Sequence, residues 1–94
     1  MSYCVTVKQE VAQFQATLGQ QHRRSLKRAI LALSQEKGDI RALTDQLAGF
    51  YRLKVGQFRV IFRYLPGKKI ECVFAEERKL VYELFEFEMR KLLE

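Results

Sequence analysis

The sequence predicts an α+β fold with an N-terminal strand, an antiparallel helix hairpin packed on a mainly antiparallel sheet, and a C-terminal helix. Apolar residues recur at helical spacing over about residues 11–33 and again from residue 81, but alternate with polar residues over about residues 50–62. Strands that follow one another directly are typical of antiparallel pairing. With 94 residues, 48% of them hydrophobic, the chain has the size of one domain, residues 1–94.

The N-terminal third predicts a strand followed by two helices. Apolar and polar side chains alternate over residues 3–7, as in a short strand. Val11, Phe14 and Leu18 then share one face of a helix, and Gly19 separates this helix from a second one. The apolar face of the second helix comprises Leu26, Ala29, Ile30 and Leu33, and its basic face comprises Arg23, Arg24, Lys27 and Arg28.

The middle of the chain predicts a β-hairpin. Lys37-Gly38-Asp39 ends the second helix, and we interpret residues 40–48 as a connecting loop. From residue 51 the pattern has a period of two, and Gly56-Gln57 forms a tight turn. A two-residue turn fixes the opposed pairs Val55–Phe58, Leu53–Val60, Tyr51–Phe62 and Lys54–Arg59.

One more strand and a last helix complete the predicted domain. The chain turns at Leu65–Lys68 into a strand that runs from about Lys69 to Ala75. The last helix is indicated by the helical spacing of Val81, Phe85, Met89 and Leu92. The helix hairpin would then cover one face of the sheet, and we expect the other face to be open.

Several classes of protein are not expected from this composition. Cys4 and Cys72 have no second Cys or His at metal-ligand spacing, so we predict two buried, reduced thiols and no metal site. No apolar run approaches the roughly 20 residues that cross a bilayer, and the first residues do not resemble a signal peptide. We therefore expect a cytoplasmic protein without a membrane partner.

The charge of the chain suggests a polyanionic partner. The net charge is +6 and the pI is about 9.6. Residues 1–70 hold 13 Lys and Arg against four acidic residues, a net charge of +9, whereas residues 71–94 hold four against seven, a net charge of −3. The body is basic and the C-terminal part is acidic.

The predicted hairpin gathers cations on the open face of the sheet. Lys54 against Arg59 is a like-charge pair, which is destabilising by a few tenths to about 1 kcal/mol. With Arg52 and Arg63 on the same face, these side chains form a positive field that a phosphate backbone would relieve. The alternative interpretation is a solvated basic face. His22 is interpreted as a surface residue away from it.

A second set of candidates follows the last predicted strand, in the segment Glu76–Tyr82. Arg78, Lys79 and Tyr82 join the same patch if this segment returns beside the hairpin. Arginine can stabilise a pentavalent phosphorane, and tyrosine can stack on a base or exchange a proton. A half-buried aromatic at the start of a helix is the alternative interpretation of Tyr82. Because metal ligands, Gly-rich phosphate loops and nucleophile triads are absent from the sequence, we expect no cofactor and favour acid/base and electrostatic phosphodiester cleavage.

Two segments resemble those of a known toxin superfamily. Leu47–Phe62 is similar to the central hairpin of the RelE/ParE toxins, and Glu77–Tyr82 is similar to their closing motif. The similarity covers nearly the whole chain, including Met1-Ser2-Tyr3, the basic second helix and the Gly38-Asp39 exit. The resemblance implies a RelE-like fold.

The RelE branch of this superfamily implies an activity. Its members are ribosome-dependent endoribonucleases of type II toxin–antitoxin systems, which cut mRNA in the A site through the ribose 2′-OH and need no metal. The resemblance implies that Arg52 and Lys54 bind and activate RNA and that Arg59 stabilises the transition state. It also implies that Arg78 is a second arginine that contacts phosphate and that Tyr82 stacks or transfers a proton. The chain departs from the family at Ala75-Glu76-Glu77, where relatives carry glycine followed by His or Lys. Glu77 is either the general base or a salt-bridged surface residue.

Two other functions remain open at this point. A chain resembling the ParE branch poisons DNA gyrase and has no nuclease activity, although that branch usually lacks the full basic and aromatic set. A buried Tyr82 would favour a nucleic-acid-binding module without catalysis.

The resemblance also implies a partner, an antitoxin with a disordered acidic or amphipathic segment. Its candidate docking residues on the last helix are Val81, Phe85, Met89 and Leu92. The alternative is that these four side chains pack on the chain's own sheet.

Overall fold

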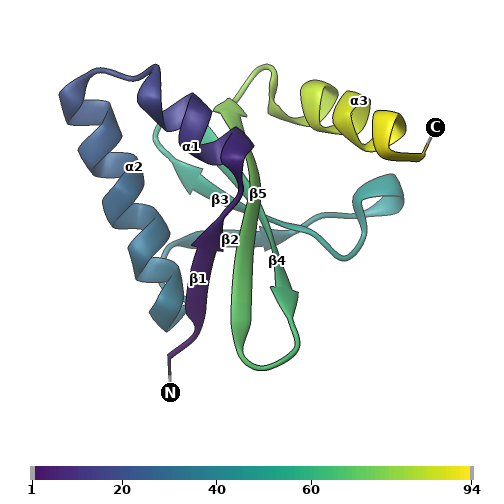
Figure 1. Ribbon diagram of the computed structural model, residues 1–94, viewed down its shortest axis with the longest axis horizontal. Helices are drawn as coiled ribbons and strands as arrows, with labels where there is room; N and C mark the ends of the chain where they lie inside the picture. Colours follow the sequence, from purple (N-terminus) through teal and green to yellow (C-terminus); the bar gives the residue numbers. More distant parts are fainter. Residues whose placement is uncertain (1, 94) are drawn as a thin grey trace.

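A five-stranded sheet with helices on both faces forms the protein (Figure 1). The computed structural model describes residues 2–93, and the side chains of residues 2–91. The strands are β1 (Cys4–Val7), β2 (Asp39–Ala42), β3 (Tyr51–Val55), β4 (Phe58–Leu65) and β5 (Lys69–Glu77). The helices are α1 (Gln9–Ala16), α2 (Gln20–Ala32) and α3 (Val81–Leu93), with short 3₁₀ helices η1 (Leu33–Gln35) and η2 (Asp45–Leu47). The predicted α+β fold is confirmed.

The sheet has the order β1-β5-β4-β3-β2 and is mainly antiparallel. Only the pair β1–β5 is parallel, as expected for strands separated by most of the chain. The β3–β4 hairpin has the predicted turn at Gly56-Gln57, and all four predicted pairs of residues are opposed across it. The register deduced from the alternating pattern is therefore correct.

The prediction of a loop over residues 40–48 is wrong. Residues Asp39–Ala42 form the edge strand β2, which pairs antiparallel with β3 and places Ile40 opposite Leu53. Gly38 leads into this strand with φ +131°, and a Cβ atom there would lie 2.7 Å from Leu53 Cδ1. This approach requires glycine and brings the chain alongside the hairpin. The strand is short and buries little, so its sequence carries almost no alternating pattern.

One face of the sheet packs on α1 and α2. Leu26 and Ile30 of α2 and Leu33 of η1 lie in one buried cluster with residues from β3, β4 and β5. Leu53, Val60 and Phe62, the residues that alternate with the cations, belong to it and are at most 1% exposed. Packing of the helices on these strand residues stabilises the fold, by roughly 1.5–3 kcal/mol for each fully buried side chain.

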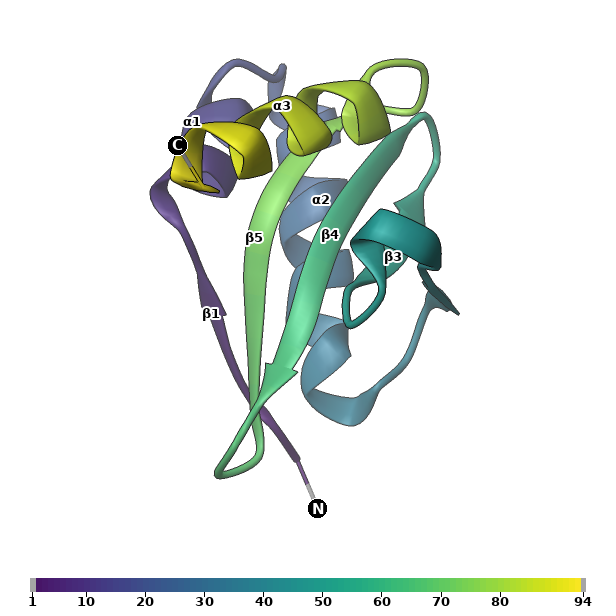
Figure 2. The same cartoon turned by 90° about the vertical axis from the view of Figure 1, so that its right-hand side faces the viewer.

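The opposite face is not open, contrary to our expectation, because α3 crosses it (Figure 2). Val81 and Phe85 of α3 lie in a second buried cluster with Leu47, Ile61 and Val73. A β-bulge in β5 pairs Ile61 with Phe74 and the next residue, Phe62, with Cys72, so Val73 is the extra residue. It places both Val73 and Phe74 in this second cluster.

Three tyrosine rings pack together near the end of β4 that lies away from the hairpin tip. The rings of Tyr3 and Tyr51 each pack edge-on against Tyr64, with centroids 5.5 and 5.0 Å away. The Tyr64 hydroxyl donates a hydrogen bond of 2.8 Å to Glu36 Oε2. Burial and this hydrogen bond to Glu36 raise the pKa of Tyr64 to about 12, so the phenol stays protonated as a donor. No helix within residues 2–93 has the length and apolarity to span a membrane.

The two cysteines differ, and the prediction that both are buried is wrong for Cys4. Both are free thiols, but Cys4 is exposed on the edge strand β1, whereas Cys72 is buried in β5. Burial, with a smaller effect of the Glu71 charge, raises the pKa of the Cys72 thiol to about 12. A side chain of an edge strand can face solvent even within an apolar run.

We expect one of the two thiols to react in the folded protein. An alkylating reagent at neutral pH should modify Cys4 and spare Cys72, which is covered and protonated. Mass spectrometry should find one adduct in buffer and two in denaturant. If the folded Cys4→Ser variant still reacted rapidly with the reagent, the burial of Cys72 would be contradicted.

Candidate nucleic-acid interface

A row of four charged residues crosses the sheet on the α3 side, near the tip of the β3–β4 hairpin. The register places Asp39 opposite Lys54, Lys54 opposite Arg59, and Arg59 opposite Glu76. The two predicted cations are therefore central, with a carboxylate on each flank. The sequence singled out the like-charge pair but missed both carboxylates, which reduce its electrostatic cost.

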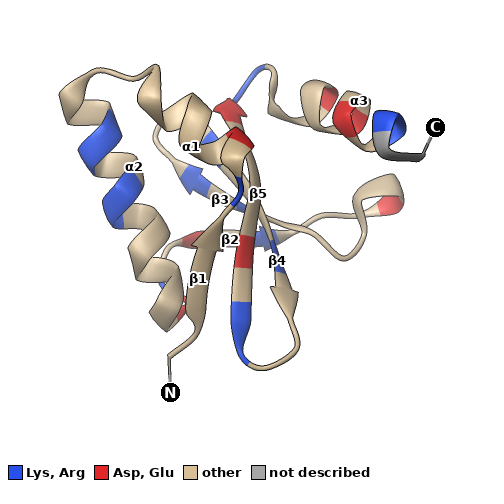
Figure 3. Cartoon of the chain, in the orientation of Figure 1, with Lys and Arg blue, Asp and Glu red and all other residues tan. Residues whose placement is uncertain are grey.

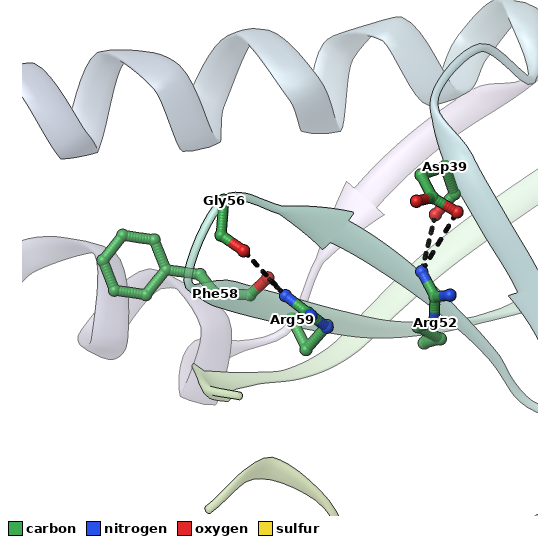
Figure 4. Close-up of polar contacts among 5 residues, drawn as sticks. All are labelled: Asp39, Arg52, Gly56, Phe58 and Arg59. Atoms are coloured by element: carbon green, nitrogen blue, oxygen red, sulfur yellow. Dashed lines mark hydrogen bonds and ion pairs between the residues drawn. The ribbon is translucent and has the colours of Figure 1, made fainter. Parts of the chain in front are cut away.

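Arg52 lies two residues before Lys54 on the same side of β3. Its Nη1 atom lies 3.2 Å from Asp39 Oδ1 and donates a second hydrogen bond of 3.2 Å to the Asp39 carbonyl oxygen (Figure 4). The Arg52 side chain is only 12% exposed. This residue therefore joins the edge strand β2 to the hairpin and has few donors directed to solvent.

Arg59 is the buried cation of the row. It is 7% exposed, and its Nη1 atom donates to the carbonyl oxygens of Gly56 and Phe58, both at 2.9 Å (Figure 4). Within the described residues no carboxylate forms an ion pair with it, so its charge meets only neutral acceptors. Arg59 thus stabilises the hairpin tip from inside, in a position that sequence reasoning treated as open.

A polar hollow lies at the hairpin tip and is called the tip hollow below. It encloses about 430 Å³ and is lined by Gly56, Gln57, Glu77, Arg78 and Lys79. The Arg78 backbone N–H donates a 2.8 Å hydrogen bond to the Gln57 carbonyl, which fixes the segment after β5 beside the tip. The segment thus returns to the hairpin, which is the condition on which its cations could join the patch. Gln57 is a lining residue that sequence reasoning used only as a turn.

The cations at the tip differ in accessibility. Lys54, Arg78 and Lys79 are exposed, and among residues 2–91 their side-chain nitrogens have no hydrogen-bond or ion-pair partner. Glu77 is an exposed carboxylate in the same hollow. Such donors around a polar hollow suit an anionic oxygen-rich ligand such as a phosphodiester.

Arg63 is not brought to the tip. It lies four residues beyond Arg59 on β4, which corresponds to about 13 Å along a strand. Both Nε and Nη2 lie 2.9 Å from Glu71 Oε1, on the neighbouring strand. Arg63 lines a different hollow, of about 350 Å³, under α3. The distance of Arg63 from the tip follows from its position in the sequence, four residues after Arg59. Its pairing with Glu71 follows from the register of β4 and β5.

Tyr82 lies at the start of α3 and is half-buried. It packs against the second apolar cluster, beside Val81 and Phe85. The position agrees with the alternative interpretation, an aromatic residue at the helix start, and leaves part of the residue exposed. His22 is exposed on α2, as predicted, with its ring edge-on to Phe58 at 5.3 Å.

Three of the four candidate docking residues on α3 pack against the sheet. Val81 is fully buried and Phe85 is 5% exposed, so both belong to the core, and Met89 is half-buried against the same cluster. The side chain of Leu92 lies outside the described part of the chain. A partner cannot reach Val81 and Phe85 unless α3 leaves the sheet. Among residues 2–93 no group of His, Cys, Asp and Glu could hold a metal ion.

Comparison with known proteins shows a likeness of fold. No family model and no curated protein matches the chain in sequence. A chain of the toxin–antitoxin complex RelBE from Mycobacterium tuberculosis aligns with a TM-score of 0.75 and 17% identity, over 83% of this chain and 100% of that chain. A chain of the archaeal RelE–RelB complex from Pyrococcus horikoshii gives 0.64 and 25%, over 83% and 97%. The Escherichia coli toxin RelE, as a mutant in the free state, gives 0.70 and 13%, over 92% and 93%.

The two arginines near the tip should differ in their effect on stability. Arg59→Ala removes the donor to two carbonyls and should lower the free energy of unfolding by about 1–3 kcal/mol. Arg78→Ala removes an exposed side chain, and its backbone hydrogen bond persists, so the change should stay within about 0.5 kcal/mol. Denaturant titration monitored by circular dichroism measures both. Equal loss in the two variants would contradict the structural role of Arg59.

Proposed function

We propose that this chain, which has the fold of the RelE/ParE toxin superfamily, is the toxin of a type II toxin–antitoxin pair and cleaves mRNA on the ribosome. The observation that carries the proposal is the tip hollow, where Arg78 and Lys79 stand beside Glu77 with Lys54 and Arg59 on the adjacent strands. RNA held in the A site is the proposed substrate.

Binding would begin with the exposed cations. Lys54, Arg78 and Lys79 can reach phosphate oxygens without first breaking a contact within the described residues. Each phosphate contact releases counterions from the RNA, so affinity should depend on salt. Tyr82, which is partly exposed, would stack on a base in our proposal. Arg52 and Arg63 would add to the field from their ion-paired positions.

Arg59 would change partners when RNA binds. Its present acceptors are two neutral carbonyls, and a charged phosphate oxygen forms a stronger hydrogen bond with a guanidinium. We propose that the scissile phosphate draws the Arg59 side chain toward it, so that this residue stabilises the negative charge of the transition state.

The proposed chemistry is internal attack. The ribose 2′-oxygen forms a bond to the adjacent phosphorus, the bond from phosphorus to the 5′-oxygen breaks, and the products carry a 2′,3′-cyclic phosphate and a 5′-hydroxyl. Glu77 is the carboxylate that lines the tip hollow, so we propose that it accepts the 2′-OH proton. The leaving 5′-oxygen gains a proton from the protein or from water. Because the nucleophile belongs to the substrate, no metal-bound water is needed.

The second candidate is a ParE-like poison of DNA gyrase without nuclease activity. Two observations favour it, namely that Arg59 is buried and that Tyr82 packs on the protein's own core. The burial of Arg59 and the packing of Tyr82 would also be expected in a nucleic-acid-binding module without catalysis. The tip hollow with its exposed cations and carboxylate favours the nuclease over both.

The proposal is tested by Arg78→Ala in a ribosome-programmed translation reaction. Loss of one contact to the transition state should reduce mRNA cleavage by about a hundredfold or more, with unchanged unfolding. The matched control is Lys69→Ala, which removes one exposed positive charge at the far end of β5. It should cleave like the parent chain.

Three further measurements separate the candidates. Cleavage should persist in a metal chelator and leave 2′,3′-cyclic phosphate ends, and binding to ribosomes should weaken steeply with salt. A gyrase supercoiling assay with the same protein should show no inhibition. Inhibition of supercoiling without mRNA cleavage would contradict the nuclease and support the gyrase poison. If neither activity is observed, the non-catalytic binding module is the remaining candidate.

An antitoxin is the proposed partner, since the similar structures include toxin–antitoxin complexes. With the inner face of α3 buried, a groove of about 700 Å³ between α2 and the edge strand β1 is the better candidate. Val7 and Leu31 in it are 45% and 60% exposed. The other lining residues are Val5, Gln15, Gln20, Arg23, Arg24, Lys27 and Ile30, so no acidic residue contributes. We propose that an acidic, amphipathic antitoxin segment lies in this groove.

Reversing charge in the groove should release the toxin from control. Arg24→Glu with Lys27→Glu should weaken antitoxin binding at least about tenfold, because two attractions become repulsions, while mRNA cleavage is retained. Titration calorimetry with the co-expressed antitoxin measures the affinity. If the groove variant kept its affinity for the antitoxin and Leu84→Glu in α3 weakened that affinity instead, the docking site would lie on α3.

A further inference from the structure

The outer face of α3 exposes a stripe of large apolar residues. Leu80, Leu84 and Phe87 are 43%, 37% and 54% exposed. Their spacing of four and three residues places them on one side of the helix, and Leu80 continues the helical turn by accepting a hydrogen bond of 3.0 Å from the Leu84 N–H. The side of α3 that packs on the sheet is formed by other residues, Val81, Phe85 and Met89.

No other described element of the chain covers this stripe. In both views α3 lies on the outside of the molecule, with one side on the sheet (Figures 1 and 2). A shallow hollow of about 240 Å³ lies along the outer side, lined by Glu83, Leu84, Glu86, Phe87 and Arg90. The Lys91 ammonium lies 4.9 Å from the centre of the Phe87 ring, a cation–π contact that shields part of the ring.

The charges around the stripe are separated along the helix. Glu83 and Glu86 lie in its first half, and Arg90 and Lys91 lie in its last turn. Glu88, between the two groups, pairs with Lys91 at 3.9 Å. Figure 3 shows the acidic part of α3 before its basic end. This order also suits the helix dipole. Acidic residues beside the stripe disfavour RNA and an acidic peptide, both of which the basic surfaces elsewhere attract. Both signs occur on one surface, so the surface complements itself when two copies are turned end for end.

We propose that this outer face is a self-association surface, on which α3 of two copies pair antiparallel about a twofold axis. Leu84 then lies against Phe87 of the second copy, at the centre of the contact. Glu83 lies near Arg90 of the second copy, and the twofold axis repeats both contacts. A parallel pairing would place Glu83 beside its own equivalent and is disfavoured.

The association is weak and depends on concentration. Three large apolar side chains per copy bury far less than the roughly 1,200 Å² of a stable interface. A dimer of micromolar or weaker affinity is what such an area supports. The surface differs from the tip hollow and from the groove at β1, so self-association does not depend on the proposed function.

Sedimentation of the purified full chain tests the proposal by charge exchange. A concentration series should show monomers and dimers in the parent chain. Glu83→Arg alone, or Arg90→Glu alone, should weaken the dimer several-fold, because each creates two like-charge contacts across the twofold axis. The double variant Glu83→Arg/Arg90→Glu restores the opposite charges and should recover the affinity. Circular dichroism should show the same helix content in all four proteins.

A second arm tests the apolar contact. Phe87→Glu should weaken the dimer by about tenfold or more, whereas Gln35→Glu, an exposed change after α2, should have no effect. A monomer at every concentration up to about 0.5 mM in the parent chain would overturn the proposal. A dimer that neither Phe87→Glu nor the single charge reversals affect would equally overturn it, because its interface would lie elsewhere.

Discussion

The two-residue turn at Gly56-Gln57 determines which side chains of the hairpin face the helices and which face outward. Gly56 has φ +57°, a conformation that a Cβ atom makes costly and that glycine adopts freely. A shift of one residue would exchange the two faces of β4. Because Leu53 and Val60 are almost completely buried on the helix side, that shift would bury charges in the core. Lys54 and Arg59 are therefore held opposite each other by the packing of their neighbours.

The structure reduces the cost of that like-charge pair in two ways. Asp39 and Glu76 flank it in the same row, and Arg59 turns its guanidinium toward the backbone at the hairpin tip. A buried arginine with only neutral acceptors is still an expensive arrangement. It is consistent with a site that is completed when an anionic ligand arrives, and it makes the tip part of both the fold and the proposed chemistry.

Three surfaces of different chemistry surround the sheet. The tip hollow is polar with cations and one carboxylate, the groove beside β1 is basic and apolar, and the outer face of α3 is apolar with both signs of charge. They are built on different elements, so one can be altered while the others remain. In our proposals the first binds the substrate, the second binds the antitoxin and the third binds a second copy. The inner face of α3 stabilises the fold through the buried side chains of Val81 and Phe85.

The sequence by itself determined the helices, the order of the main strands and the hairpin register, because these depend on local periodicity and on one tight turn. It also allowed Arg78 to return to the hairpin, since the strand before it is antiparallel, and the hydrogen bond from the Arg78 N–H to the Gln57 carbonyl decided that it does. Tertiary structure decided the edge strand β2, whose partner lies on a separate segment, and the packing of α3 over the face we expected to be open. It also decided that Arg59 is buried and that Arg63 pairs with Glu71. These features rest on contacts between distant segments, and periodicity reports a residue's own conformation but not which element covers it.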